Sequence, residues 1–67
     1  MADALGWAYY KLGSADLAVK ELEESVHMTP ANPIYQYHLG MAYASARRWD
    51  KAARSLRTAL KDDSNFP

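Results

Sequence analysis

Residues 5–9, Leu-Gly-Trp-Ala-Tyr, return as Leu-Gly-Met-Ala-Tyr at residues 39–43, which begin 34 positions further along the chain. When the 67-residue chain is laid on itself at this offset, eight of the 33 superposed pairs are identical. Roughly two or three identities would be expected by chance in a chain so rich in alanine. The four identical pairs outside the two stretches are Asp16/Asp50, Ala18/Ala52, Leu22/Leu56 and Pro33/Pro67. The chain therefore contains an internal repeat with a period of 34 residues.

The sequence around the repeated stretch favours helices. The chain contains twelve alanines but only five β-branched residues, and alanine favours helix whereas β-branched residues favour strand. Apolar residues recur at intervals of three and four, which is the spacing of one helix face. This pattern predicts four helices, at residues 2–12, 15–28, 33–45 and 49–61. The identical pairs fall on their apolar faces, which we expect to form the core.

The predicted helix boundaries carry their own signals. Gly13 can adopt the left-handed backbone conformation in which helices often end, and Ser14 can cap the next helix by accepting hydrogen bonds from its free N–H groups. Asn32 followed by Pro33 is the pattern of an N-cap with proline at the first helical position. Arg47 stands where the first pair of helices has its turn glycine, so we expect a strained or longer turn there.

The repeated pattern resembles the tetratricopeptide repeat, a 34-residue helix–turn–helix unit that reads W-x2-L-G-x2-Y, then A-x3-F, then P. The first unit matches through residues 5–9, Ala18, Leu22 and Pro30, and the second through residues 39–43, Ala52 and Leu56. The departures from the pattern are Ala2 and Gln36 in place of tryptophan, Ser64 in place of the second proline, and Arg47 in place of the turn glycine.

The resemblance implies a fold class and a domain organisation. We expect an all-α solenoid of tandem helix–turn–helix units, with four antiparallel helices in right-handed superhelical stacking. The first repeat would occupy residues 1–32 and lack its opening residues, and the second would occupy residues 33–66. Because the register places the start of a third unit at Phe66-Pro67, we expect a segment of a longer array. Gly6 and Gly40 would let the paired helix, which carries Ala18 or Ala52, approach closely.

The resemblance also implies a binding site. On the first and third helices a second, largely aromatic stripe lies opposite the core face, and in the family this side lines a concave groove where peptides or partner helices dock. The predicted groove residues are Asp3, Trp7, Tyr10, Lys11, Ile34, Tyr37, His38, Met41 and Ser45. We expect Trp7, Tyr10, Tyr37 and Met41 to form one continuous exposed patch. The alternative is that these rings only shield the packing between repeats or became exposed when neighbouring repeats were lost.

One variant of the family clamps the terminal carboxylate of chaperone tails with Lys, Asn and Arg side chains of the groove. Here Asp3, Trp7 and His38 stand at three of the positions that such groups would occupy. Lys11 is the remaining cation in the stripe of the first helix. An apolar or amphipathic peptide or helix is therefore the expected ligand.

Charge is divided between the two halves of the chain. Eight basic residues balance eight acidic ones overall, but residues 1–33 carry a net charge of −3 and residues 34–67 carry +3. We expect contacts between acidic residues of the second helix and basic residues of the fourth, from the set Glu21, Glu23, Glu24, Arg54, Arg57 and Lys61. The neutral total argues against a general polyanion binder, and the basic residues are predicted to form a solvated face rather than a nucleic-acid site.

Other functional classes lack the residues they need. There is no cysteine for a disulfide, a redox centre or a thiolate metal site. His27 and His38 lie on different predicted helices without a further ligand at metal-binding spacing. No catalytic triad, phosphate-binding glycine loop or paired-carboxylate cleft can be built, so we expect neither an enzyme nor a cofactor. No run of apolar residues is long enough to span a membrane, and we expect a soluble, cytoplasmic rather than secreted protein.

Self-association is the alternative function. The face of the fourth helix that bears Trp49, Ala53, Leu56 and Leu60 is broader than one partner helix can cover. At the other end of the chain, Leu5 and Tyr9 are expected to be uncovered as well. A repeat buries its apolar faces by stacking on its neighbours. The charge split favours head-to-tail stacking of copies into a longer solenoid or a homo-oligomer.

Overall fold

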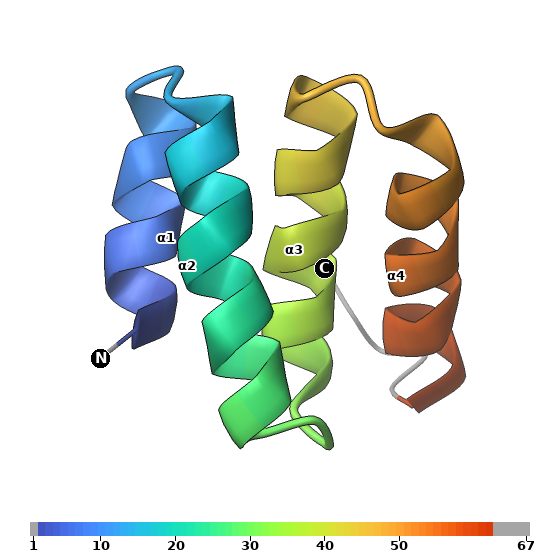
Figure 1. The fold of residues 1–67 in the computed structure, drawn as a ribbon. Coiled ribbons are helices and arrows are strands. Elements are labelled where there is room, and N and C mark those ends of the chain that lie inside the picture. The colour runs from blue at the N-terminus through green and yellow to red at the C-terminus, as the bar shows by residue number, and fades with distance from the viewer. Residues whose placement is uncertain (1, 63–67) are drawn as a thin grey trace.

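Four α-helices make up the described part of the molecule, a computed structural model in which residues 2–62 are placed and side chains are described for residues 4–61. They are α1 (Ala2–Lys11), α2 (Ala15–Met28), α3 (Pro33–Ser45) and α4 (Trp49–Asp62) (Figure 1). The predicted helix boundaries are confirmed to within one residue, and residues 2–62 contain no strand. The predicted start of a third unit, Phe66-Pro67, lies outside the described residues.

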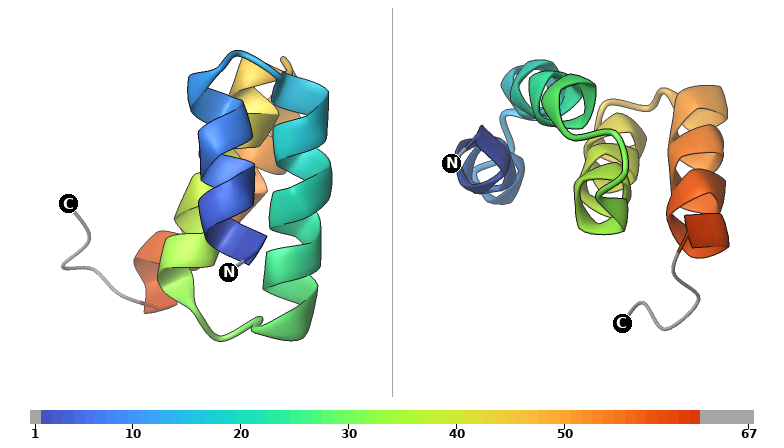
Figure 2. Two further views of the ribbon diagram at one scale, coloured as in Figure 1. Left: turned by 90° about the vertical axis from the view of Figure 1, so that its left-hand side faces the viewer. Right: turned by 90° about the horizontal axis from the view of Figure 1, so that it is seen from below.

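The helices form two antiparallel hairpins, α1 with α2 and α3 with α4, which we call the first and second hairpins. Each helix packs against the next one in the chain, and α1 also contacts α3. Seen from below, the four helices follow a zigzag with α1 and α4 at its two ends (Figure 2). Across residues 2–62, α4 contacts neither α1 nor α2. Within this described part of the chain, one side of α1 and one side of α4 therefore have no neighbouring helix.

The core lies between the hairpins and inside the second one. Its buried residues come from α2, α3 and α4 and are Ala18, Val19, Leu22, Leu39, Ala42, Tyr43 and Ala52. On α1 the expected core face is largely open: Leu5 is 46% exposed and Ala8 is exposed, whereas their counterparts Leu39 and Ala42 are 5% and 0% exposed. The reason is positional, because α3 packs between α2 and α4 while α1 has helices on one side only. The expectation that Leu5 is uncovered is therefore confirmed, and the same expectation for Tyr9 is wrong, because Tyr9 is half-buried and packs against the core cluster.

The two repeated glycines allow the helices of each hairpin to approach closely. A Cβ atom on Gly6 would lie 2.6 Å from Cγ of Leu22, and a Cβ on Gly40 would lie 2.7 Å from Cγ of Leu56. The expected close approach of the helices that carry Ala18 and Ala52 is confirmed, and the side chains nearest to the glycines are those of Leu22 and Leu56. Those alanines lie one helical turn earlier on the same faces.

The two hairpins have the same turn. Gly13 has φ 83° and Arg47 has φ 62°, so both adopt the left-handed conformation. In the first turn, Gly13 N–H donates to the carbonyl oxygen of Tyr10 at 3.0 Å and Ser14 N–H donates to that of Tyr9 at 2.9 Å. The two corresponding hydrogen bonds of the second turn, which lies 34 residues further along the chain, are 3.0 Å and 2.9 Å long. This is the Schellman ending of a helix, and the arginine turn is therefore strained, as expected, but not longer.

Of the two residues predicted to cap the start of a helix, one makes the capping hydrogen bonds and the other does not. Asn32 caps α3 as predicted, because its Oδ1 accepts from Ile34 N–H at 2.9 Å and from Tyr35 N–H at 3.4 Å. The prediction for Ser14 is wrong, since its side chain makes no capping hydrogen bond. Its backbone instead completes the turn after α1, and its carbonyl oxygen accepts from Ala18 N–H at 2.9 Å.

The expected ion pairs between α2 and α4 are absent from residues 4–61. The two helices do not touch, because α3 lies between them. One ion pair instead joins the two hairpins at their turns, between Arg48 Nη2 and Asp16 Oδ1 at 3.9 Å. Their side chains are 46% and 89% exposed, so this pair stabilises the fold by less than about 1 kcal/mol.

Candidate functional site

Four aromatic rings meet across the contact between α1 and α3. Trp7 stacks on Tyr10 of its own helix, with ring centroids 4.5 Å apart and planes 7° apart. It also stacks on His38 of α3, at 4.1 Å and 16°. Tyr37 is tilted against His38 at 5.8 Å and 49°. The order Tyr10, Trp7, His38, Tyr37 forms a row that joins the two hairpins, and we call it the aromatic row.

All four rings of the aromatic row are half-buried. The Trp7–His38 stack therefore contributes to packing between the hairpins while part of each ring stays accessible to solvent. Stacked aromatic pairs contribute about 0.5–1.5 kcal/mol beyond the apolar area that they bury. The row is thus held in place by its own contacts. This geometry accommodates both interpretations of the sequence, the packing role and the binding role.

The remaining predicted groove residues lie on the same two helices as the row. Met41 is half-buried, Ile34 is 49% exposed, and Lys11 and Ser45 are exposed. The side chain of Asp3 lies outside the described residues, although its backbone belongs to α1. The structure therefore brings Trp7 together with Tyr10 and His38, which stack on it, and with Tyr37, which contacts His38. It adds exposed apolar area from Ile34 and one cation from Lys11.

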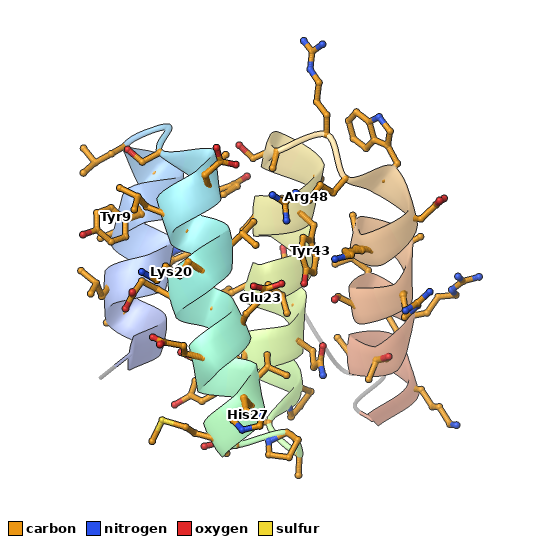
Figure 3. The ribbon with its side chains drawn as sticks, in the orientation of Figure 1. Tyr9, Lys20, Glu23, His27, Tyr43 and Arg48 are labelled. Carbon is orange, nitrogen blue, oxygen red and sulfur yellow. The ribbon has the colours of Figure 1, made fainter. Side chains whose placement is uncertain are left out.

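A hydrogen bond that sequence reasoning missed joins the hairpins on the side of α2. Tyr43 Oη donates to Glu23 Oε2 at 2.5 Å, and Figure 3 shows the two side chains meeting between α2 and α3 with Arg48 beside them. Burial, the hydrogen bond and the negative charge of Glu23 raise the pKa of Tyr43 to about 12, although Arg48 and Arg54 act in the opposite direction. Lys51 Nζ lies 5.8 Å from the centre of the same ring.

Neither the Tyr43–Glu23 hydrogen bond nor the Trp7–His38 stack has a strong signal in the sequence. Glu23 is one of several acidic residues on α2, and nothing in its spacing distinguishes it from its neighbours. His38 stands three residues before Met41, so it shares the groove face of α3. That spacing predicts the face but not the stack on Trp7, which depends on how far α1 is shifted along α3.

The hollows of the molecular surface lie away from the aromatic row. One of about 400 Å³ is lined by residues 47–51, in the turn and first residues of α4. Another, of about 600 Å³, is lined by Lys20, Glu23, Glu24, His27 and Met28, all on one side of α2. Each of these two hollows has walls from a single turn or a single helix, so it is open to solvent and does not enclose a ligand. A third hollow, of about 460 Å³, lies between the turns of the two hairpins and is lined by residues 13–17 and 45–47.

The described residues offer neither a metal site nor a membrane span. Among the residues whose side chains are described, no three His, Asp or Glu side chains come together in a way that could hold a metal ion. None of the helices within residues 2–62 is both long enough and apolar enough to cross a membrane.

Similarity to known proteins extends over nearly the whole chain. The family model described as tetratricopeptide repeat matches residues 4–66. The chain is also similar to the Hsp70-Hsp90 organising protein of Plasmodium falciparum (isolate 3D7), with 30% identity over 61 residues. These residues are 91% of this chain but 11% of that relative, so the chain spans a small part of its length.

Proposed function

Because the chain belongs to the tetratricopeptide repeat family, we propose that it is a protein-interaction module that binds an apolar or amphipathic peptide or helix on the aromatic row. Repeats of this family generally mediate protein–protein interaction and are typically scaffolds without enzymatic activity. We divide the chain into a first repeat at residues 1–32 and a second at residues 33–66. The row takes residues from both, so binding needs the two repeats together.

The aromatic row is the observation that carries this proposal. Tryptophan and tyrosine dominate the energetics of protein interfaces, because they present large apolar area at a low cost in side-chain entropy. Here Trp7 is held between two other rings, which reduces the entropy it would lose on binding. Exposed Ile34 extends the apolar surface on α3. A ligand with two or three apolar side chains on one face would fit this surface.

The similarity to an Hsp70-Hsp90 organising protein raises a second candidate ligand, the terminal carboxylate of a chaperone tail. Binding a terminal carboxylate needs several cationic or amide groups around it. Trp7 and His38 occupy two of the positions where those groups would stand, and they are stacked on each other. Lys11 supplies one cation. These features favour an apolar ligand over a carboxylate.

Peptides selected from a random library against the immobilised chain test the proposal. We expect the selected peptides to be rich in apolar side chains, and Trp7→Ala to weaken their binding by about 2 kcal/mol or more. Trp49→Ala is the matched control, because Trp49 lies on α4 and is not part of the row. Should Trp7→Ala lower the melting temperature, Ile34→Lys tests the same surface at an exposed position.

Three outcomes would contradict the proposal. The first is a selection that yields no binders, and the second is a set of binders that Trp49→Ala weakens and Trp7→Ala does not. The third is a strong preference for peptides with a free carboxyl terminus over the same peptides amidated. That preference would favour the carboxylate ligand instead.

A further inference from the structure

We propose that His38 determines which ligands the aromatic row accepts. Its ring covers one face of the Trp7 indole, so the row binds neutral apolar side chains and rejects cationic ones. This role rests on the proposed function, because it concerns the chemistry of the ligand at the same site. It gives His38 a part in specificity in addition to its part in packing.

Both faces of the Trp7 indole are covered by other rings. Tyr10 is stacked on the indole at 4.5 Å with the planes 7° apart, and His38 is stacked on it at 4.1 Å with the planes 16° apart. Two rings stacked on the same face would contact each other, whereas residues 4–61 contain no ring contact between Tyr10 and His38. The two rings therefore lie on opposite faces, and the indole is the middle layer of three.

The two covering rings occupy the positions that a bound cation would take. A Lys or Arg side chain, or a quaternary ammonium group, binds an aromatic residue over the face of its ring, within about 6 Å of the ring centroid. The centroids of Tyr10 and His38 already lie inside that distance on the two sides of Trp7. A cationic side chain would have to displace one of these rings, and lose its stacking, before it gained any attraction to the indole.

The accessible part of Trp7 is therefore the edge of its ring. Trp7 is half-buried, and an aromatic ring is negative over its faces but positive around its edge. The indole edge also carries an N–H group, which is a hydrogen-bond donor and not an acceptor. Such an edge suits apolar groups and oxygen acceptors and is unfavourable for a positive charge.

Of the two covering rings, His38 is the one whose position depends on the packing of the hairpins. Tyr10 follows Trp7 by three residues on α1, so these two side chains share a helix face wherever α3 lies. His38 comes from α3, which α1 contacts. Its ring also contacts that of Tyr37, at 5.8 Å and 49°. The packing of α3 on α1 therefore holds His38 over Trp7, and the specificity needs both repeats.

Repulsion between positive charges is the other way in which the row could reject a cation. Lys11 is exposed on α1, and the imidazole of His38 becomes positive when it is protonated. The substitution His38→Ala removes both the ring and this charge, so it does not separate the two causes by itself. His38→Phe is the matched control, because it removes the charge and keeps an aromatic ring over the indole.

Two small probes of the same shape test the proposal. They are choline and the neutral alcohol in which carbon replaces its quaternary nitrogen, titrated at constant ionic strength. The indole N–H signal of Trp7 in 15N-labelled protein reports their binding. In wild type and in His38→Phe, choline should bind no more tightly than the alcohol, because both faces of the indole are covered. In His38→Ala one face is open, so choline should bind about two- to fivefold more tightly than the alcohol.

Trp49 provides an internal reference in the same spectra. It is the first residue of α4 and lies outside the aromatic row. Its response to the two probes should therefore be the same in wild type, His38→Ala and His38→Phe.

Three results would overturn this role of His38. The first is a preference of wild-type Trp7 for choline, a measurement that needs no variant. The second is an equal gain of choline binding in His38→Phe and His38→Ala, which would assign the rejection to charge. The third is a His38→Ala chain that does not prefer choline. If His38→Ala loses helicity by circular dichroism, Tyr10→Ala opens the opposite face of the indole and takes its place.

The probes separate this role from the proposed function, because they contain no peptide. A wild-type chain that binds no selected peptide counts against the proposed function and leaves the coverage of Trp7 as measured. Peptides that bind wild type while the probes give one of the three contrary results would leave the proposed function in place and remove the role of His38.

Discussion

Gly40 and Leu56 lie so close that the Cβ absent from Gly40 would stand 2.7 Å from both Cγ and Cδ2 of the leucine. The leucine backbone N is also close, at 3.3 Å from the same point. Real Cβ atoms do not approach another carbon to 2.7 Å, because dispersion contacts between carbons are optimal near 3.5–4.0 Å. The spacing of α3 and α4 is therefore set by glycine at this position, and the same relationship recurs between Gly6 and Leu22.

Gly40→Ala should destabilise the fold by about 1 kcal/mol. Overpacking typically costs about 1–3 kcal/mol, which outweighs the roughly 1 kcal/mol that alanine gains over glycine inside a helix. Urea denaturation measures the change. The double variant Gly40→Ala, Leu56→Ala no longer has the clash. Its loss of stability should therefore be smaller than the sum of the losses in the two single variants. Additive effects would show that the close approach does not constrain the hairpin.

Arg47→Gly should stabilise the protein by about 1 kcal/mol. Arg47 has φ 62°, a conformation that costs a residue with a side chain about 1–2 kcal/mol, and glycine recovers most of this despite its larger entropy in the unfolded chain. Gly13→Ala is the reverse test, since an added Cβ there meets nothing within 4 Å and would report backbone strain alone. It should destabilise by a similar amount. Equal melting temperatures for Arg47→Gly and wild type would show that the arginine turn is unstrained.

Asn32→Ala should cost about 1 kcal/mol, because α3 would lose the side-chain acceptor for its first N–H groups. Ser14→Ala serves as the matched control at the start of α2. Its side chain makes no capping bond, so we expect a change within about 0.5 kcal/mol. Thermal unfolding of the two variants measures the loss of stability in each. Equal losses in both would contradict the difference between the two caps.

Tyr43 should make the stability fall steeply in alkaline solution. Its pKa is raised from the ordinary 10.0 to about 12 in the folded protein, so the folded state holds the phenol proton more tightly than the unfolded state does. The stabilisation is fully present below about pH 10 and is lost as the pH rises towards about 12. Other tyrosines and the lysines also titrate there, so the comparison is with Tyr43→Phe. The free energy of unfolding of wild type should decline more steeply with pH than that of Tyr43→Phe, and parallel curves would contradict the shift.

Features that depend on local spacing were predictable from the sequence. The internal period predicts the four helices and their pairing into two hairpins, because residues 5–9 and 39–43 repeat the same spacing closely. The capping role of Asn32 was also predictable, because proline follows it. Local rules failed at Ser14, where the left-handed Gly13 before it directs the serine backbone into the preceding turn.

Features that depend on the placement of whole helices were harder to predict from the sequence. A helical wheel puts Ala18 and Leu22 on one face but does not say which of them lies over Gly6, because that depends on the shift between α1 and α2. Opposite charges suggested that α2 and α4 would meet, yet α3 separates them. In the candidate site, the stripe on α1 and α3 was predicted, whereas the stack of Trp7 on His38 was not, since it depends on how α1 lies along α3.

The two tryptophans allow the central claim to be tested in one measurement. Trp7 lies in the aromatic row and Trp49 is the first residue of α4, so the two indole N–H signals of 15N-labelled protein report on different surfaces. A selected peptide should shift the Trp7 signal and leave the Trp49 signal in place. A peptide that shifts Trp49 and leaves Trp7 unmoved would contradict the assignment of the aromatic row as the binding surface.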